Sequence, residues 1–71
     1  MKEEGFFTSW FTSKGYGWIQ RIENGETKSY FAHISQVGNG IPQIGDRARF
    51  QIAGGKRGPV AKNIEIVGRP V

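Results

Sequence analysis

The segment at residues 14–19, K-G-Y-G-W-I, alternates glycine with large aromatic rings directly after a lysine. Alternate side chains of a strand share a face, so Tyr16 and Trp18 point together while Gly17 points the other way. Glycine keeps its side of the strand low, and the opposite rings can then lie flat against a sheet. Such rings stack nucleic-acid bases, at roughly 1–3 kcal/mol per base, and Lys14 is placed to contact a phosphate. The segment therefore predicts a platform for unpaired bases.

A second segment, Y-F-A-H-I at residues 30–34, repeats this combination further along the chain. The strand period puts Phe31 and His33 on one face and the other three side chains on the opposite face. RNA-binding sheets use aromatic side chains on two adjacent strands to stack two or three bases. A ring nitrogen of His33 can also hydrogen-bond a base or a phosphate. We therefore expect the two segments to be neighbouring strands of one binding surface.

The apolar residues repeat with a period of two, which predicts strands rather than helices. Five runs rich in β-branched and aromatic residues are bounded by turn-forming residues, at 5–12, 15–22, 28–34, 47–53 and 60–67. Asn24 and Gly25 predict a type I′ hairpin turn, because both positions then need a positive φ. Residues 38–42 and 54–59 are predicted loops. Five short strands with tight connections indicate a small all-β barrel.

The remaining runs indicate which faces form the core. The fourth run alternates plainly, with Ala48, Phe50 and Ile52 expected inside and its two arginines facing water. Phe6 and Phe7 are adjacent and must point oppositely, so we expect one of them in the core. The second and third runs carry large apolar side chains on both faces. The second face of that pair is therefore expected to bind something flat.

The composition limits the class of protein. The chain has 71 residues, a formal net charge of +4, 13% aromatic residues, one histidine and no cysteine. We expect one domain over residues 1–71, with no disulfide, metal or cofactor. Apolar runs are far shorter than the ~20 residues of a membrane span, and the N-terminus lacks a signal-peptide pattern, so we expect a cytoplasmic protein. A lone histidine, scattered carboxylates and a glycine-rich segment that precedes a strand indicate that the protein is not an enzyme.

The sequence resembles the cold-shock domain family. Three motifs carry the resemblance, in the family's order: residues 14–19 (K-G-F-G-F-I in the family), residues 31–34 (F-V-H-F) and residues 57–64 (K/R-G-P-x-A-x-N-V). The resemblance implies a five-stranded antiparallel OB-type barrel that binds single-stranded DNA and RNA with low sequence specificity. It also implies the work of an RNA chaperone or of a transcription or translation regulator.

Carried over by position, the resemblance implies stacking roles for Tyr16, Trp18, Phe31 and His33. Lys14 and Arg57 match cations that contact the nucleic-acid backbone.

The first strand departs from the family pattern. It reads Ser9-Trp10-Phe11-Thr12 where the family has K-W-F-N, and counting without gaps puts Ser9 on the tryptophan position. We nevertheless expect Trp10 to reach the binding face, because so large a ring is hard to bury in a small domain. The secondary candidates for nucleic-acid contact are Phe11, Ile34, Ile41 and Lys56.

Two further departures reduce the number of stacking platforms. Ile34 replaces the last aromatic residue of F-V-H-F, and the predicted loop at residues 38–42 has no aromatic residue and Ile41 as its one large apolar residue. Fewer platforms predict weaker binding or a shorter footprint than is typical of the family.

Two rival functions remain open. An SH3-like or OB-type barrel could hold an extended, proline-rich peptide on the same aromatic strip, although such grooves usually add acidic residues and here the nearby charges are Lys14 and Arg57. An accessory domain of the ribosome or of RNA polymerase would bind structured RNA instead.

Any single surface cation, such as Lys56 or Lys62, could be a plain solvated charge. The basic surface and short edge strands favour a monomer.

Overall fold

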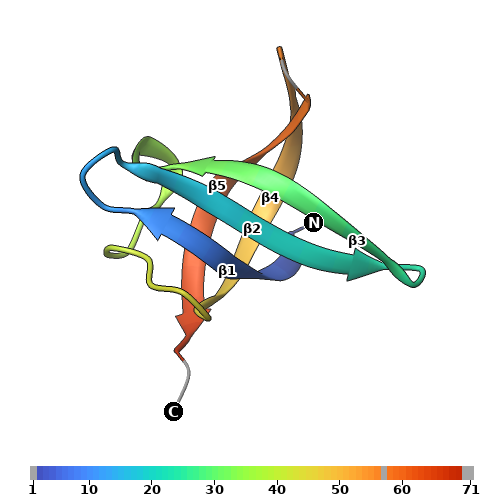
Figure 1. Ribbon diagram of the computed structural model, residues 1–71, viewed down its shortest axis with the longest axis horizontal. Helices are drawn as coiled ribbons and strands as arrows, with labels where there is room; N and C mark the ends of the chain where they lie inside the picture. The colour runs from blue at the N-terminus through green and yellow to red at the C-terminus, as the bar shows by residue number, and fades with distance from the viewer. Residues whose placement is uncertain (1, 57, 70–71) are drawn as a thin grey trace.

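The computed structural model describes residues 2–56 and 58–69 (Figure 1). Its elements are β1 (Glu3–Phe11), β2 (Tyr16–Glu23), β3 (Glu26–His33), the short 3-10 helix η1 (Ile34–Gln36), β4 (Arg47–Gly55) and β5 (Gly58–Gly68). Within these two ranges, no helix has the length and apolar character that crossing a membrane requires.

The strands close into a barrel in the order β1-β2-β3-β5-β4, with β4 paired back onto β1. Figure 1 shows β1, β2 and β3 crossing in front of β4 and β5. All neighbouring strands are antiparallel except β3 and β5, which meet in parallel where Phe31 pairs with Val60. This arrangement confirms the all-β, OB-type barrel expected from the sequence.

The two long hairpins differ in how well the sequence predicts them. Asn24 and Gly25 have φ values of 51° and 80°, as the predicted type I′ turn between β2 and β3 requires. By contrast, residues 54–59 are not the loop that was predicted. β4 continues to Gly55 and β5 begins at Gly58, and these two residues pair with each other. The β4–β5 hairpin consequently projects beyond the barrel (Figure 1).

The core contains the inward residues of all five strands: Phe7, Ile19, Tyr30, Ala32, Ala48, Phe50, Ala61 and Ile64. Phe7 is the inward member of the adjacent phenylalanine pair, and Phe6 is 55% exposed. The expectation that Ile52 is inside is wrong, since its side chain is 42% exposed. Ile52 lies beyond Phe50, where the pairing of β4 with β1 ends and β4 is paired with β5 alone.

The segment between η1 and β4 is fastened by a buried carboxylate. Asp46 is fully buried, and its Oδ2 accepts a hydrogen bond from the backbone N–H of Gln43 at 3.0 Å. Arg69 places its Nε 3.7 Å from the same oxygen and donates from Nη2 to the carbonyl of Ile41 at 3.2 Å. These contacts tie the end of the described chain to the loop that follows η1.

Candidate nucleic-acid interface

The pairing of β2 with β3 builds a continuous strip of rings on the outside of the barrel. Trp18 is directly opposite Phe31, and Tyr16 is opposite His33, so the four side chains share one face. The Phe31 ring lies 5.4 Å from Tyr16 and 5.5 Å from Trp18, measured between centroids. Trp18 is 40% exposed, whereas Tyr16 and Phe31 are half-buried. Water therefore reaches rings that the sequence predicted to be a platform.

Phe11 extends this strip onto β1. It pairs with Tyr16, the two ring centroids are 5.4 Å apart, and the Phe11 side chain is 45% exposed. We use the name aromatic face for the surface formed by Phe11, Tyr16, Trp18, Phe31 and His33. Phe11, a secondary candidate for nucleic-acid contact in the sequence analysis, is thus part of the aromatic face.

Trp10 lies on the side of β1 opposite to the aromatic face. The expectation that Trp10 reaches the binding face is therefore wrong. A register shift between Phe7 and Ser9 puts Ser9 opposite Trp18 and Trp10 opposite Gly17. The indole packs edge-on against the buried ring of Phe7, with centroids 5.8 Å apart and planes at 89°. Its Nε1 is buried and has no hydrogen-bond partner among the described residues.

Gly17 explains why so large a ring fits there. A Cβ atom at Gly17 would lie 2.7 Å from Cε3 of Trp10 and still closer to the carbonyl oxygen of Ser9. The missing side chain therefore provides the space that the indole fills. The sequence did contain a signal for the inward position of Trp10. Counting residues without gaps puts Ser9, and not Trp10, on the family's tryptophan position.

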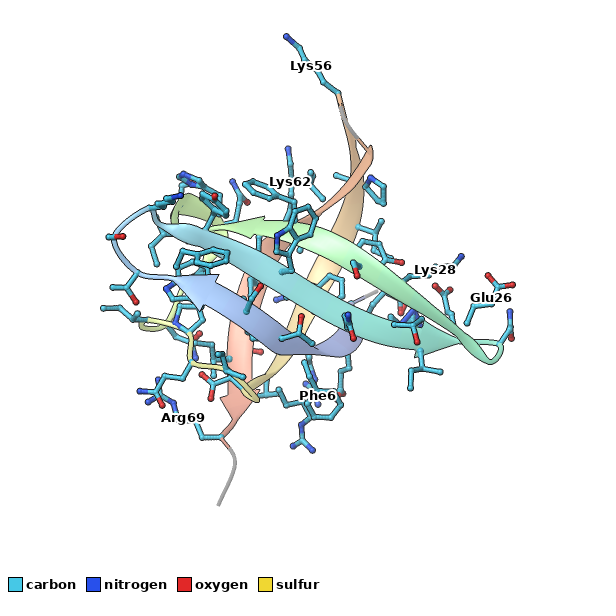
Figure 2. The ribbon with its side chains drawn as sticks, viewed as in Figure 1. Phe6, Glu26, Lys28, Lys56, Lys62 and Arg69 are labelled. Carbon is cyan, nitrogen blue, oxygen red and sulfur yellow. The ribbon has the colours of Figure 1, made fainter. Side chains whose placement is uncertain are left out.

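A groove of about 660 Å³ runs beside the aromatic face. Its lining comes from β2, β3 and the β4–β5 hairpin: Tyr16, Trp18, Ser29, Phe31, Lys56, Gly58, Pro59 and Val60. Rings form one wall, and Pro59 and Val60 form the other. Figure 2 shows Lys56 extending from the tip of the hairpin, at the outer end of this wall. The groove can accommodate a flat apolar ring next to an anion.

Ion pairs neutralise many cations elsewhere on the barrel. The paired cations are Arg21, with Glu3 and Glu23; Lys28, with Glu23; Arg47 and Arg49, both with Glu4; and Arg69, with Asp46. Lys2, Lys14, Lys56 and Lys62 form no ion pair within residues 2–56 and 58–69. Figure 2 places Lys56 and Lys62 on one side of the barrel and Arg69 on the opposite side. Lys56 lines the groove and Lys14 lies in the turn before Tyr16, so these two unpaired cations flank the aromatic face, whereas Lys2 lies near η1.

The remaining sequence candidates occupy different places. Lys14 is exposed in the turn that precedes Tyr16, and Arg57 lies outside the described residues. Ile34 is not on β3 as expected. It begins η1, where its side chain is exposed and its N–H donates to the carbonyl of Gly15 at 2.8 Å. Ile41 is exposed beside Arg69, away from the rings, so the structure does not bring it to the aromatic face.

His33 ends β3 and caps η1. Its Nδ1 accepts a hydrogen bond from the backbone N–H of Ser35 at 3.2 Å and lies 2.9 Å from the Ser35 Oγ. Because Nδ1 is an acceptor, we assign the proton of the neutral ring to Nε2. The exposed imidazole thus presents an N–H donor next to Phe31.

Comparison with known proteins finds several similar sequences. A cold shock-like protein of Thermotoga maritima is 36% identical over 59 residues, covering 82% of this chain and 89% of the relative. The cold shock-like protein CspC of Bacillus cereus is 36% identical over 56 residues, covering 78% and 86%. A cold shock-like protein of Aquifex aeolicus is 34% identical over 61 residues, covering 83% and 87%. No family model matches the chain.

Among solved structures, the one described as drosophila Unr CSD456 superposes with a TM-score of 0.75 at 20% sequence identity. The match covers 96% of this chain and 27% of that chain, so this barrel corresponds to about a quarter of the longer protein. At that identity the superposition establishes a shared fold.

Proposed function

The chain belongs to the cold-shock domain family, and from this membership we propose that it binds single-stranded DNA and RNA with low sequence specificity on its aromatic face. Family membership supports nucleic-acid binding in general. The proposal that single strands bind on the aromatic face rests on one observation: Tyr16, Phe31 and Trp18 form a contiguous, solvent-accessible strip. Every base has a π-face, so stacking on this strip tolerates any sequence.

The proposed action is passive. Bases stack on the rings while Lys14, Lys56 and Arg57 hold the phosphates. A protein that binds only the open strand shifts the equilibrium away from hairpins by mass action, without ATP. This would suit an RNA chaperone or a regulator of transcription or translation.

Salt dependence tests the charge part of this proposal. Three phosphate contacts to a single strand should release about 0.7 ions each, which gives a log–log slope of affinity against salt of roughly −2. Quenching of tryptophan fluorescence by oligo-dT across a range of KCl concentrations measures this slope. Stacking should preserve weak binding at high salt. A slope of zero would show that the cations do not contact the phosphates.

The two tryptophans allow a separate test of orientation. Trp18→Phe should still bind oligo-dT, because phenylalanine also stacks, but its remaining Trp10 emission should change little. Trp10→Phe should keep most of the quenching, since Trp18 then reports alone. Equal quenching of both variants would show that the indole of Trp10 also meets the ligand. Titration with a proline-rich peptide in place of oligo-dT tests the rival peptide-binding function, which quenching by the peptide alone would favour.

A further inference from the structure

A second, smaller hollow lies along β3 and β5, and Phe31 separates it from the groove. It measures about 170 Å³. Its lining comes from β3, η1 and β5: Phe31, His33, Ser35, Gln36, Val60, Ala61 and Lys62. We call it the Lys62 hollow. Phe31 and Val60 also line the groove, so the two spaces adjoin.

The parallel pairing of β3 with β5 places Lys62 beside His33. Phe31 is opposite Val60, and two residues further along each strand are His33 and Lys62. In parallel strands this step of two keeps both side chains on the same outward face. Both residues are exposed, and Figure 2 shows Lys62 rising from β5 on the side of Lys56. A cation and an imidazole therefore flank the same opening.

Three polar side chains around this opening, those of His33, Gln36 and Lys62, offer hydrogen-bond donors. Nε2 of His33 carries the ring proton, because Nδ1 accepts from Ser35. Oε1 of Gln36 accepts from the backbone N–H of Asn63 at 3.3 Å, which leaves the amide NH₂ of Gln36 as a donor. Lys62 contributes an ammonium group without an ion pair in the described part of the chain. No carboxylate belongs to the described lining, so the donor set suits an anion.

We propose that the Lys62 hollow binds a backbone phosphate of the strand whose base stacks on Phe31, with Lys62 as a nucleic-acid-binding residue. The inference rests on the proposed function. Phe31 is the shared wall, so a base in the groove and a phosphate in the hollow are neighbouring parts of one nucleotide chain. A fourth phosphate contact should steepen the salt slope from roughly −2 toward −3, at about 0.7 ions per contact.

Replacement of Lys62 by methionine tests the site, since methionine keeps an unbranched apolar stem and removes the charge. Lys62→Met should weaken oligo-dT binding about 3- to 10-fold between 50 and 200 mM salt and make the slope shallower by about 0.7. Lys28→Met is the matched control. Lys28 pairs with Glu23 at 3.8 Å on the β2–β3 hairpin, so its loss should leave binding within twofold of the unmodified protein.

Oligonucleotides with one neutral methylphosphonate linkage, moved position by position, identify the phosphate. At one linkage the unmodified protein should lose binding while Lys62→Met loses no more, since the contact is already absent. Titration with inorganic phosphate tests the alternative that the Lys62 hollow binds a free phosphate ion instead of a nucleic-acid phosphate. NMR shifts at His33 and Lys62 that saturate with free phosphate, together with unchanged oligonucleotide affinity in Lys62→Met, would assign a free-anion site and overturn the inference.

The remaining outcomes separate the inference from its premise. If Lys62→Met and the unmodified protein bind oligo-dT equally while Trp18→Ala binds weakly, the Lys62 hollow has no role and the aromatic face stands. If the unmodified protein binds neither oligo-dT nor oligo-U, the proposed function itself is wrong.

Discussion

Phe50→Ala is expected to cost about 3–5 kcal/mol of unfolding free energy. Phe50 is fully buried in β4 and contacts the buried ring of Tyr30, with the centroids 5.4 Å apart. Truncation leaves a cavity between β3 and β4, which are not paired with each other, so neighbouring side chains cannot readily fill it. A core of this size rarely supplies more than about 3–5 kcal/mol in total. Most of the variant should therefore be unfolded at 25 °C.

Urea titration followed by circular dichroism measures this loss. Ile52→Ala is the matched control, because it removes a large apolar side chain two residues along the same strand. Ile52 is 42% exposed, so its truncation should cost less than about 1.5 kcal/mol. Equal losses in the two variants would contradict the assignment of Phe50 to the core and of Ile52 to the projecting hairpin.

Trp18→Ala carries the second large effect, on binding rather than on stability. Loss of one stacking platform should cost about 1–3 kcal/mol, or roughly 5- to 150-fold in affinity for oligo-dT. Trp18 lies outside the core cluster and is 40% exposed, so the variant should stay folded. Fluorescence anisotropy of a labelled oligonucleotide measures the affinity, since the variant has lost its reporting tryptophan.

Phe6→Ala provides the aromatic control for that experiment. Phe6 is 55% exposed on β1 beside Arg47, and Figure 2 shows it on the side of the barrel away from Lys56 and Lys62. Its removal should leave the affinity within twofold. Unfolding of Trp18→Ala, or an equal loss of binding in Phe6→Ala, would mean that Trp18 is structural or that the interface lies elsewhere.

Local patterns predicted the part of the site that local geometry determines. The alternation of Tyr16 and Trp18 with Gly17 and Ile19 assigns the two faces of β2, and the burial of Ile19 confirms it. The turn at residues 24–25 then joins β2 to β3, so the register of Trp18 with Phe31 follows from a short connection.

Features that depend on interruptions or on distant strands were not predictable in this way. One shift of register before Ser9 exchanges the faces of Trp10 and Phe11, because side chains alternate with a period of two. Ile34 leaves the strand pattern because Ser35 bonds to His33 and turns the chain into η1. Lys62 lines the same hollow as His33 because β3 pairs with β5, a strand far away in sequence, and the residues next to Lys62 in the chain do not predict that pairing.

The most direct test of the binding surface is an NMR chemical-shift map of the protein with a short pyrimidine oligonucleotide. We expect the largest shifts at the residues of the aromatic face and along the groove: Phe11, Tyr16, Trp18, Phe31, His33, Lys56 and Pro59. Shifts gathered instead around Phe6 and Arg47, with these rings undisturbed, would contradict the proposal that bases stack on β2 and β3.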